Sequence, residues 1–445
     1  MSTKEKNEGL MEKIVSLAKR RGFVFPGSEI YGGLANSWDY GPLGVELKNN
    51  IKQLWWERFV RRRDDVVGID SALIMNPKVW EASGHVSNFT DPLVECKKCH
   101  ERFRADQIDL KAPCENCKAK DSFTEARQFN MMFKTFIGPA EEKSNVAYFR
   151  PETAQGMFVD FKNVLDTTRK TLPFGIAQIG KAFRNEITPG NFIFRTREFE
   201  QMEIEYFITP PARDEDWKDF FEAWRKEMHS WMKDDLQLDP SKVHELEVPD
   251  GERAHYSKRT IDFEFDFPFG RKELYGLAYR TDFDLKNHFK EAPYRDQQTG
   301  EVYWPHVIEP TWGVDRSFLA VLANSYVEDG DRVYLKLPPR LVPYKAAIFP
   351  LLANKPQLVE PARKIYDDLR KRFMVAWDDR GNIGKRYYAQ DEIGTPFCIT
   401  VDFDTLGEGD AADKDTVTVR DRDTGKQERV KIEKLADFIA ERLEK

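Results

Sequence analysis

Three arginines, Arg184, Arg195 and Arg316, are spaced along this chain so that they could surround a triphosphate. Arg184 ends an apolar segment, where its planar guanidinium could bind two oxygens of one phosphate. Arg195 follows the loop after that segment and could fold over the outer phosphates. Arg316 lies three residues after Gly313 at a predicted helix start, where backbone N–H groups also attract anions. Phe199 offers a flat face for adenine, so these residues together predict an ATP site.

Two glutamates could hold Mg²⁺ for this ATP. Glu273 begins the strand-like segment Glu273-Leu-Tyr-Gly276, and Glu309 lies in the segment Val307-Ile-Glu-Pro310. Mg²⁺ takes oxygen ligands and usually shares them with substrate phosphates. Taken alone, an arginine beside a glutamate on a strand is more often a surface ion pair. The prediction therefore depends on the order in which all these residues occur.

Four of the five cysteines form two Cys-x-x-Cys pairs, Cys96 with Cys99 and Cys114 with Cys117, separated by fourteen residues. Two such turns can direct four thiolates at one ion, a pattern typical of a structural Zn²⁺ site. The alternatives are two disulfides or unrelated reduced thiols, and a cytoplasmic location disfavours the disulfides. Cys398 lies in an apolar run, where we expect a core residue.

The elements expected to position the arginines are the strands and helices of an antiparallel sheet. Residues 174–186 and 198–207 are rich in apolar and aromatic residues, and they predict a hairpin with a long connection. A strand at 307–310 then leads into a helix at 315–325. Helices are also predicted at 42–61, which starts with a proline, and at 216–233. The run 66–75 predicts a strand that ends at Asn76-Pro77.

Length and composition limit the possible classes of protein. The chain has 445 residues, a net charge of −7 and no run of eighteen apolar residues, so no transmembrane helix is expected. The polar start, Met1 to Glu12, predicts no signal peptide and a cytoplasmic protein. Acidic net charge neither indicates nor excludes binding of nucleic acid. We expect a catalytic domain at 1–335 with a cysteine-rich insert at about 94–125, and a second domain at 336–445.

The order of these motifs resembles the class II aminoacyl-tRNA synthetases. That class has a helix–strand–proline motif, a second motif F-R-x-E followed by R-x-x-x-F, and a third ending in Gly-x-x-Arg. Here they correspond to 42–77, then Phe183-Arg-Asn-Glu186 with 195–199, then Gly313-Val-Asp-Arg316. Over nearly its whole length the chain is similar to the homodimeric glycyl-tRNA synthetases. The strings that carry this narrower resemblance are Ile30-Tyr-Gly-Gly33, Trp38-Asp-Tyr-Gly-Pro42, Trp80-Glu-Ala-Ser-Gly-His85, Arg150-Pro-Glu-Thr-Ala-Gln-Gly156, Arg195-Thr-Arg-Glu-Phe199, His255-Tyr256, Arg280-Thr-Asp-Phe-Asp-Leu285, Gly384-Lys-Arg-Tyr387, Asp391-Glu-Ile-Gly-Thr-Pro396 and Arg420-Asp-Arg-Asp-Thr424.

The resemblance implies an α+β fold: a class II antiparallel-sheet core, a zinc-ribbon insert and a C-terminal α/β anticodon-binding domain. Residues that match the family's ATP site are Arg184, Asn185, Glu186, Phe194, Arg195, Thr196, Arg197, Glu198, Phe199, Glu273, Leu274, Gly313, Val314, Asp315 and Arg316. Residues that match its glycine site are Arg104, Glu152, Phe199, Glu200, Gln201, Met202, Glu203, Glu309, Pro310, Thr311, Trp312 and Gly313. Within these sets, Arg184 and Glu186 are expected at the α-phosphate and adenine side of ATP. Phe199 and Arg316 are expected to sandwich the base.

Glycine offers an ammonium, a carboxylate and no bulk. The resemblance therefore implies that Glu152, Glu203 and Glu309 bind the ammonium through charge-assisted hydrogen bonds. Competing amino acids are all larger, so exclusion by clash suffices and no editing domain is expected. Thr311 stands where the family usually has serine, and its methyl group narrows the pocket. His85 and His255 are candidate general bases, although lone histidines more often serve local hydrogen bonding.

The implied partners are ATP, glycine, tRNA and a second copy of the chain. In the C-terminal block, cations lie beside aromatic residues, which suits phosphates and unstacked bases, although charge alone equally predicts a solvated helix face. These residues are Arg363, Lys364, Arg370, Lys371, Arg372, Lys385, Arg386, Tyr387 and Tyr388. The first motif, with Trp55-Trp56 and the strand ending at Pro77, is expected at the dimer interface.

Two alternatives remain open from the sequence. The first is another class IIa synthetase, of the prolyl, threonyl, histidyl or seryl type. The second is a synthetase-like accessory protein without catalytic activity. Such proteins tend to lose the motif arginines, whereas this chain retains Arg184, Arg195 and Arg316.

Overall fold

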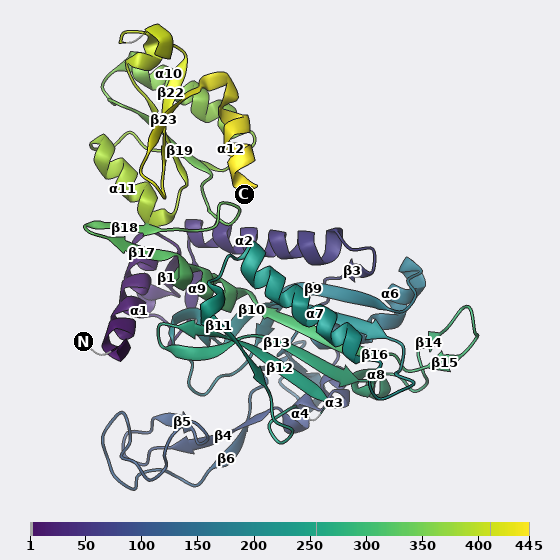
Figure 1. Ribbon diagram of the computed structural model, residues 1–445. Helices are drawn as coiled ribbons and strands as arrows, with labels where there is room; N and C mark the ends of the chain where they lie inside the picture. Colours follow the sequence, from purple (N-terminus) through teal and green to yellow (C-terminus); the bar gives the residue numbers. More distant parts are fainter. Residues whose placement is uncertain (1–2, 255, 410, 445) are drawn as a thin grey trace.

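A seven-stranded sheet forms the centre of the chain (Figure 1). The computed structural model describes residues 3–254, 256–409 and 411–444. Every neighbouring pair of strands is antiparallel except β9 and β3. In spatial order the strands are β11 (Val243–Glu247), β12 (Arg259–Phe267), β13 (Gly270–Thr281), β16 (His306–Gly313), β10 (Glu198–Ile208), β9 (Phe174–Phe183) and β3 (Val66–Gly68).

Four helices bury their apolar sides on one face of this sheet, namely α1 (Thr3–Arg20), α2 (Pro42–Trp56), α7 (Lys218–Ser230) and α9 (Val314–Ser325). Their buried residues share one core with Met202 and Trp312 of the sheet. Trp55 of α2 is fully buried there, with its ring 5.4 Å from that of Trp312. Pro42 occupies the first turn of α2, and a π-helical turn at Glu57–Arg61 continues the helix, so the helix predicted at 42–61 is confirmed.

The strand predicted over 66–75 is much shorter than expected. β3 ends at Gly68, and the chain leaves the sheet where Ser71 donates from its backbone N–H and its hydroxyl to Gln178 Oε1, at 2.6 and 2.8 Å. Asn76 accepts a hydrogen bond from the Lys78 N–H, and Pro77 begins helix α3 (Pro77–Ala82). The prediction was wrong because the proline starts a helix here, a position that its missing N–H favours equally.

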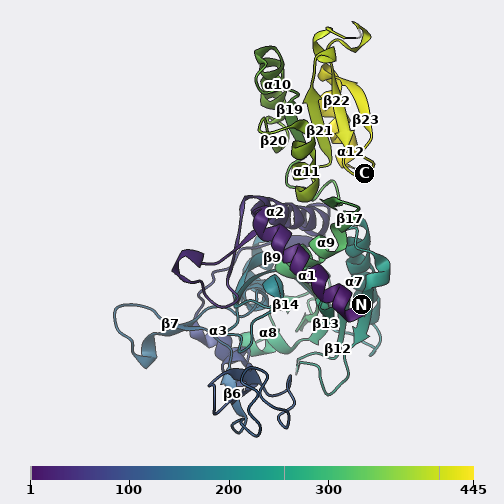
Figure 2. The same ribbon diagram turned by 90° about the vertical axis from the view of Figure 1, so that its left-hand side faces the viewer.

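The C-terminal part forms a second sheet with its own apolar core. Its strand order is β20-β19-β21-β22-β23, with β19 parallel to both β20 and β21 and the remaining pairs antiparallel. Figures 1 and 2 both show this unit stacked on the side of the central sheet where α2 lies. The hairpin of β17 (Tyr326–Asp329) and β18 (Arg332–Leu335) precedes it. Its elements are β19 (Ala346–Pro350), α10 (Pro356–Leu369), β20 (Val375–Trp377), α11 (Ile383–Ile393), β21 (Phe397–Val401), β22 (Thr416–Asp421), β23 (Gln427–Lys431) and α12 (Leu435–Leu443).

The cysteine-rich insert is a small three-stranded sheet at the end of the molecule away from the C-terminal unit (Figure 1). It consists of β4 (Thr90–Glu95), β5 (Arg102–Arg104) and β6 (Arg127–Asn130). The remaining short elements are β1 (Val24–Pro26), β2 (Trp38–Tyr40), α4 (His85–Asn88), β7 (Lys134–Phe136), β8 (Val146–Tyr148), α5 (Ala154–Val159), α6 (Phe161–Thr168), α8 (Phe283–His288), β14 (Tyr294–Arg295) and β15 (Val302–Tyr303). Within the described residues, none of the helices combines the length and the apolar character needed to cross a membrane.

Candidate active site

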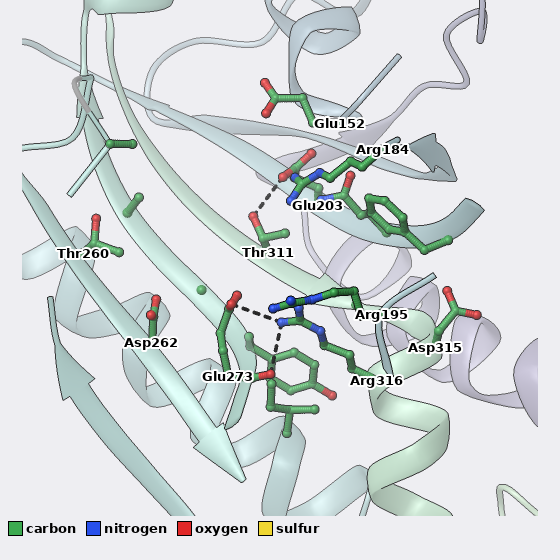
Figure 3. A pocket seen from close by; sticks show the side chains of 18 of the residues that line it. Glu152, Arg184, Arg195, Glu203, Thr260, Asp262, Glu273, Thr311, Asp315 and Arg316 are labelled. Carbon is green, nitrogen blue, oxygen red and sulfur yellow. Dashed lines mark hydrogen bonds and ion pairs between the residues drawn. The ribbon is translucent and has the colours of Figure 1, made fainter. Parts of the chain in front are cut away.

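A cavity of about 480 Å³ lies on the face of the central sheet opposite the helices. Strands β10, β12, β13 and β16, the end of the β9–β10 connection and the start of α9 all contribute to its lining (Figure 3). Successive side chains of a strand point to opposite faces. Gln201 and Glu203 of β10 therefore line the cavity, whereas Met202 and Ile204 belong to the core under the helices.

The same alternation corrects several predicted site residues. The side chains of Met202 and Trp312, predicted at the glycine site, are fully buried in the core on the other face. Val314, predicted at the ATP site, is buried there as well, and Pro310 is not among the described residues that line the cavity. These residues adjoin site residues along the chain, but neighbouring residues of a strand point to opposite faces of the sheet.

One end of the cavity carries the predicted arginines. Arg316 Nη1 lies 3.0 Å from the Glu273 backbone oxygen and 3.1 Å from Glu273 Oε2, and its guanidinium stacks 4.5 Å from the ring centroid of Phe194. Figure 3 shows Arg195 and Arg316 both extending into the pocket. Arg184 packs 5.3 Å from the Phe199 ring centroid and donates to the Pro151 carbonyl at 3.1 Å. Three cationic side chains and two aromatic faces thus meet in one space.

Three residues predicted at the ATP site lie elsewhere. Asn185, Arg197 and Glu198 line a second, more open cavity of about 1050 Å³, bounded by residues 34–40 and by α2. Arg197 Nη1 donates to the Ala35 carbonyl at 3.1 Å, on this outer side of the hairpin. Thr196 and Phe199 border both cavities, because they lie where the connection rejoins the sheet.

The other end of the cavity is acidic and buried. Glu203 accepts hydrogen bonds from Thr311 Oγ1 at 2.9 Å and from the Thr153 hydroxyl. Glu309 Oε1 lies 2.6 Å from Arg280 Nη1, which makes a buried ion pair. Glu152 accepts from Gln155 Nε2 at 2.9 Å and lies 3.4 Å from His85 Nε2.

Burial and mutual repulsion hold protons in this cluster. Burial raises the pKa of Glu309 to about 8, with Glu203 and Glu152 adding to the rise and Arg280 opposing it. Burial and the neighbouring Glu152 also raise the pKa of Glu203. Burial opposes ionisation of Glu152, but His85, Arg280 and Gln155 together outweigh it and lower the pKa of that carboxyl. Such a cluster favours a cation that brings its own hydrogen-bond donors, as an ammonium group does.

Sequence reasoning assigned no role to two residues beneath these carboxylates. Arg280 is 1% exposed, and besides Glu309 it makes two bonds of 2.8 Å to Asp284. Glu205 is fully buried, and neither of its carboxylate oxygens has a hydrogen-bond partner among the described residues. Its carboxylate lies within 4.8 Å of those of Glu203 and Glu309. The signal for Glu205 was its two-residue spacing from Glu203, which places both on one strand face.

Two lining residues on β12 were also missed. Thr260 and Asp262 alternate with apolar residues that face the core, so the strand's polar face was readable from the sequence. Burial and the neighbouring Glu273 raise the pKa of Asp262 to about 7. An acidic pair therefore lies beside Arg316 (Figure 3).

Glu273 and Glu309, both predicted as magnesium ligands, cannot bind the same ion. In the β13–β16 pairing, Glu309 lies opposite Ala278, which is five residues along β13 from Glu273. At roughly 3.3 Å per residue, the two backbone positions are separated by about 16 Å along the strands, beyond the joint reach of two glutamate side chains. The oxygens that one Mg²⁺ binds lie about 2.1 Å from the ion, so only one of the two glutamates can belong to such a site.

Arg104 and the four cysteines lie in the insert. Arg104 lines the cavity, and its Nη1 pairs with Asp91 at 2.8 Å. The sulfurs of Cys96, Cys99, Cys114 and Cys117 lie within 4.8 Å of one another. The separations are 3.6 Å between Cys96 and Cys117 and 3.8 Å between Cys99 and Cys114. Four ligands about 2.3 Å from a tetrahedral ion stand roughly 3.8 Å apart, so the sulfurs fit a metal such as Zn²⁺.

Cys398 and the predicted bases differ from the site residues in their surroundings. Cys398 is 1% exposed in a small apolar cluster with Phe349, as expected for a core residue. His85 is buried, and its Nδ1 lies 2.8 Å from Ser83 Oγ, so it supports Glu152. His255 lies outside the described residues.

The cationic surface predicted on the C-terminal unit is only partly accessible. Arg363 is exposed and stacks 3.7 Å from the Trp377 ring centroid. Arg386, by contrast, is 2% exposed and bonds the carbonyls of Pro350 at 2.6 Å and Gly381 at 2.8 Å. Tyr387 shares a hydrogen bond with Thr400 at 2.7 Å. Arg386 is therefore not available as a surface cation, because it holds the turn before its own helix.

Comparison with known proteins first establishes the class. The model of the tRNA synthetase class II core domain (G, H, P, S and T) matches residues 133–325, and that of an anticodon binding domain matches residues 345–442. Fold and pocket together thus define a class II tRNA synthetase, and the predicted fold class is confirmed.

Full-length relatives then identify the family. A glycine--tRNA ligase of Alkaliphilus oremlandii is 50% identical over 472 residues, which cover 98% of this chain and 99% of the relative. Similar proteins of the same name from Caldanaerobacter subterraneus and Thermobifida fusca are also 50% identical, each over 97% of this chain and 98% of the relative. The chain belongs to the glycine--tRNA ligase family.

Proposed function

We propose that this chain activates glycine with ATP and transfers the glycyl group to the 3′ end of a tRNA. The observation that carries the proposal is that one cavity joins a cationic, aromatic end to a buried acidic end. The first suits a nucleoside triphosphate, and the second suits a small ammonium. Between them, the carboxylate of a bound glycine meets the α-phosphate. Membership of the family supports the same reaction.

In the first step, a glycine carboxylate oxygen attacks the α-phosphorus of ATP in line, and the bond from that phosphorus to the pyrophosphate oxygen breaks. Arg184 is proposed to bind the α-phosphate, while Arg195 and Arg316 bind the outer phosphates. Phe199 would stack on the adenine. These residues act by positioning the reactants and neutralising charge, the main contributions to phosphoryl and nucleotidyl transfer.

Magnesium fits beside the outer phosphates. Glu273 and Asp262 approach each other near Arg316, and carboxylate oxygens shared with phosphates are the ligands that Mg²⁺ prefers. When bound, the ion would neutralise the developing charge on pyrophosphate. Arg316, now paired with Glu273, would then turn toward the phosphates.

Glycine recognition is proposed to rest on Glu152, Glu203 and Glu309. Glu203 already accepts two hydrogen bonds, one of them from Thr311, so its carboxylate is fixed before glycine arrives. A side chain on the amino acid would have to enter this packed, charged end, where it would displace bonded groups. The site would therefore select an amino acid that has a free ammonium and no bulky side chain.

In the second step, the 3′-terminal ribose hydroxyl attacks the glycyl carbonyl and displaces AMP. We propose no protein general base for this step. The C-terminal unit is the proposed anticodon-binding surface, with the domain boundary near residue 336, and support comes from the match over residues 345–442. Its exposed candidates are Arg363, Lys364, Arg370, Lys371, Arg372, Lys385 and Tyr388.

Structural zinc and a homodimer belong to the same proposal. The four sulfurs of the insert have tetrahedral separations, and Zn²⁺ would hold the segment that carries Arg104. For the dimer, Ile30 and Tyr31 are 88% and 87% exposed, which suits a surface that a second copy covers. Trp55 is buried within its own chain and cannot take the interface role predicted for it. A cytoplasmic location remains a prediction.

Glycine-dependent exchange of pyrophosphate into ATP tests the proposal. We expect exchange with glycine and none with alanine, serine, proline, threonine or histidine. Arg316→Ala should abolish exchange while the circular dichroism spectrum and melting temperature stay near those of the parent chain. Exchange with another of these amino acids but not glycine would favour a different class IIa synthetase. A folded chain without any exchange would favour an accessory protein.

A further inference from the structure

A buried ionic network borders the ATP end of the cavity and joins four separate elements; Glu200 and Asp315 also line the cavity. Its members are Tyr40 of β2, Lys48 of α2, Glu200 of β10 and Asp315 of α9. Lys48 Nζ lies 3.0 Å from Asp315 Oδ1 and 3.1 Å from Glu200 Oε2. The Lys48 residue is only 8% exposed and Asp315 only 6%.

Asp315 uses both of its carboxylate oxygens in this network. Oδ1 accepts from Lys48 and from the Tyr40 hydroxyl, and Oδ2 accepts from the backbone N–H of Glu200 at 2.7 Å. The first turn of α9 is thereby tied to a backbone position of β10. Figure 3 shows Asp315 on the opposite side of its helix start from the arginine that follows it.

The lysine is charged and lies between two carboxylates. Burial lowers the pKa of Lys48, but Asp315 and Glu200 outweigh burial, and the net effect raises it. Two of its N–H groups point to the two carboxylates, and the ammonium lies 4.1 Å from the Tyr40 ring centroid. Lys52 adds a second cation, 3.0 Å from Glu200 Oε1. Two cations therefore balance two carboxylates.

The residues next to this network belong to the proposed ATP site. Arg316 directly follows Asp315, and Phe199 directly precedes Glu200. The side chains proposed to bind the outer phosphates and the adenine, Arg316 and Phe199, therefore extend from neighbouring backbone positions that one carboxylate holds together. Lys48 itself lines only the second cavity and does not touch the first.

We propose that Lys48 is a positioning residue for ATP, which sets the spacing between Arg316 and Phe199 by neutralising Asp315 and Glu200. The inference rests on the proposed ATP site. Without the ammonium that bridges them, the Asp315 and Glu200 carboxylates repel each other inside the protein, and the start of α9 moves away from β10. Arg316 and Phe199 then lose the relative position from which they would bind one ATP.

The three glutamates proposed to bind the glycine ammonium do not share these contacts. Glu152 is held by Gln155 and His85, and Glu309 by Arg280. A change at Lys48 is therefore expected to affect ATP and leave glycine binding almost unaltered. Loss of general stability would lower the amount of active enzyme and would not raise one Michaelis constant selectively.

The test is steady-state ATP–pyrophosphate exchange on the full chain, with the KM of each substrate measured separately. Lys48→Met, which keeps the length of the side chain, is expected to raise the KM for ATP about tenfold or more and to change the KM for glycine less than twofold. Asp315→Asn should act in the same direction. The double variant should be no worse than either single one, because it removes one charge of each sign.

Lys345→Met is the matched control. Lys345 is another partly buried lysine, and its Nζ donates to the carbonyls of Arg340 and Val342, both at 2.9 Å, in the segment before the C-terminal sheet. It should lower the melting temperature without changing either KM. An unchanged KM for ATP in Lys48→Met, with Arg316→Ala inactive, would refute the positioning role alone. Equal rises of both KM values would also refute it, whereas full exchange by Arg316→Ala would refute the ATP site itself.

Discussion

Binding of glycine is expected to release a proton from the acidic end of the cavity. When glycine binds, its ammonium enters beside Glu309. Burial raises the pKa of this carboxyl to about 8. Arg280 Nη1 occupies Oε1, which leaves the other oxygen to carry the proton. A cation beside a carboxyl lowers its pKa, so the proton leaves as glycine binds.

The magnitude follows from the titration of one group. At pH 7, a carboxyl with a pKa of about 8 is roughly nine-tenths protonated, so about 0.9 proton should be released for each glycine bound. Near pH 9 the release should fall to about 0.1 proton. Because glycine selects the ionised form, its affinity should be roughly fifty-fold weaker at pH 6 than at pH 8.

Isothermal titration calorimetry measures this proton directly. The observed heat of glycine binding at pH 7 should differ between phosphate and Tris buffers by about 0.9 times the difference in their ionisation enthalpies. Glu309→Gln, which has no proton to release, should bind glycine more weakly and lose the dependence on buffer. Normal glycine binding with buffer-independent heats, or uptake of a proton, would show that Glu309 is already ionised and would refute the reasoning.

Three further outcomes are expected. Thr311→Val removes the hydroxyl that donates to Glu203 at 2.9 Å. It should weaken glycine binding by about 1–3 kcal/mol, which appears as a higher KM for glycine, with an unchanged KM for ATP as the check. Chelation or the substitution Cys114→Ser should remove one metal ion per chain, as measured by atomic absorption. Glycine activation should then fall, because Arg104 lies in the same insert and lines the cavity, and full activity of the metal-free chain would contradict this. Arg386→Met should destabilise the C-terminal unit by about 3 kcal/mol or more, because it leaves several carbonyls unpaired, and calorimetry measures this loss. It should also abolish tRNA charging while pyrophosphate exchange continues, which the two activity assays test.

The short-range features of this chain could be predicted from its sequence. Pro42 and the apolar spacing after it predicted a helix to residue 61, and the structure has one. The spacing of the cysteines predicted four sulfurs around one point. The order of Arg184, Arg195 and Arg316 indicated one site, and they line one cavity. Such features depend on residues only a few positions apart or on motifs whose spacing is itself the signal.

The tertiary structure decided which side chains share a space. Met202 and Trp312 belong to the core and not to the site, because each strand sends alternate residues to opposite faces and long-range pairing sets which face is buried. Arg280 contacts Glu309, which lies 29 residues away in the sequence, and Lys48 contacts Asp315, which lies 267 residues away. The sequence determined the chemical groups that this protein has; only the folded sheet determined which of them hold the others in place, because burial and register arise between distant segments.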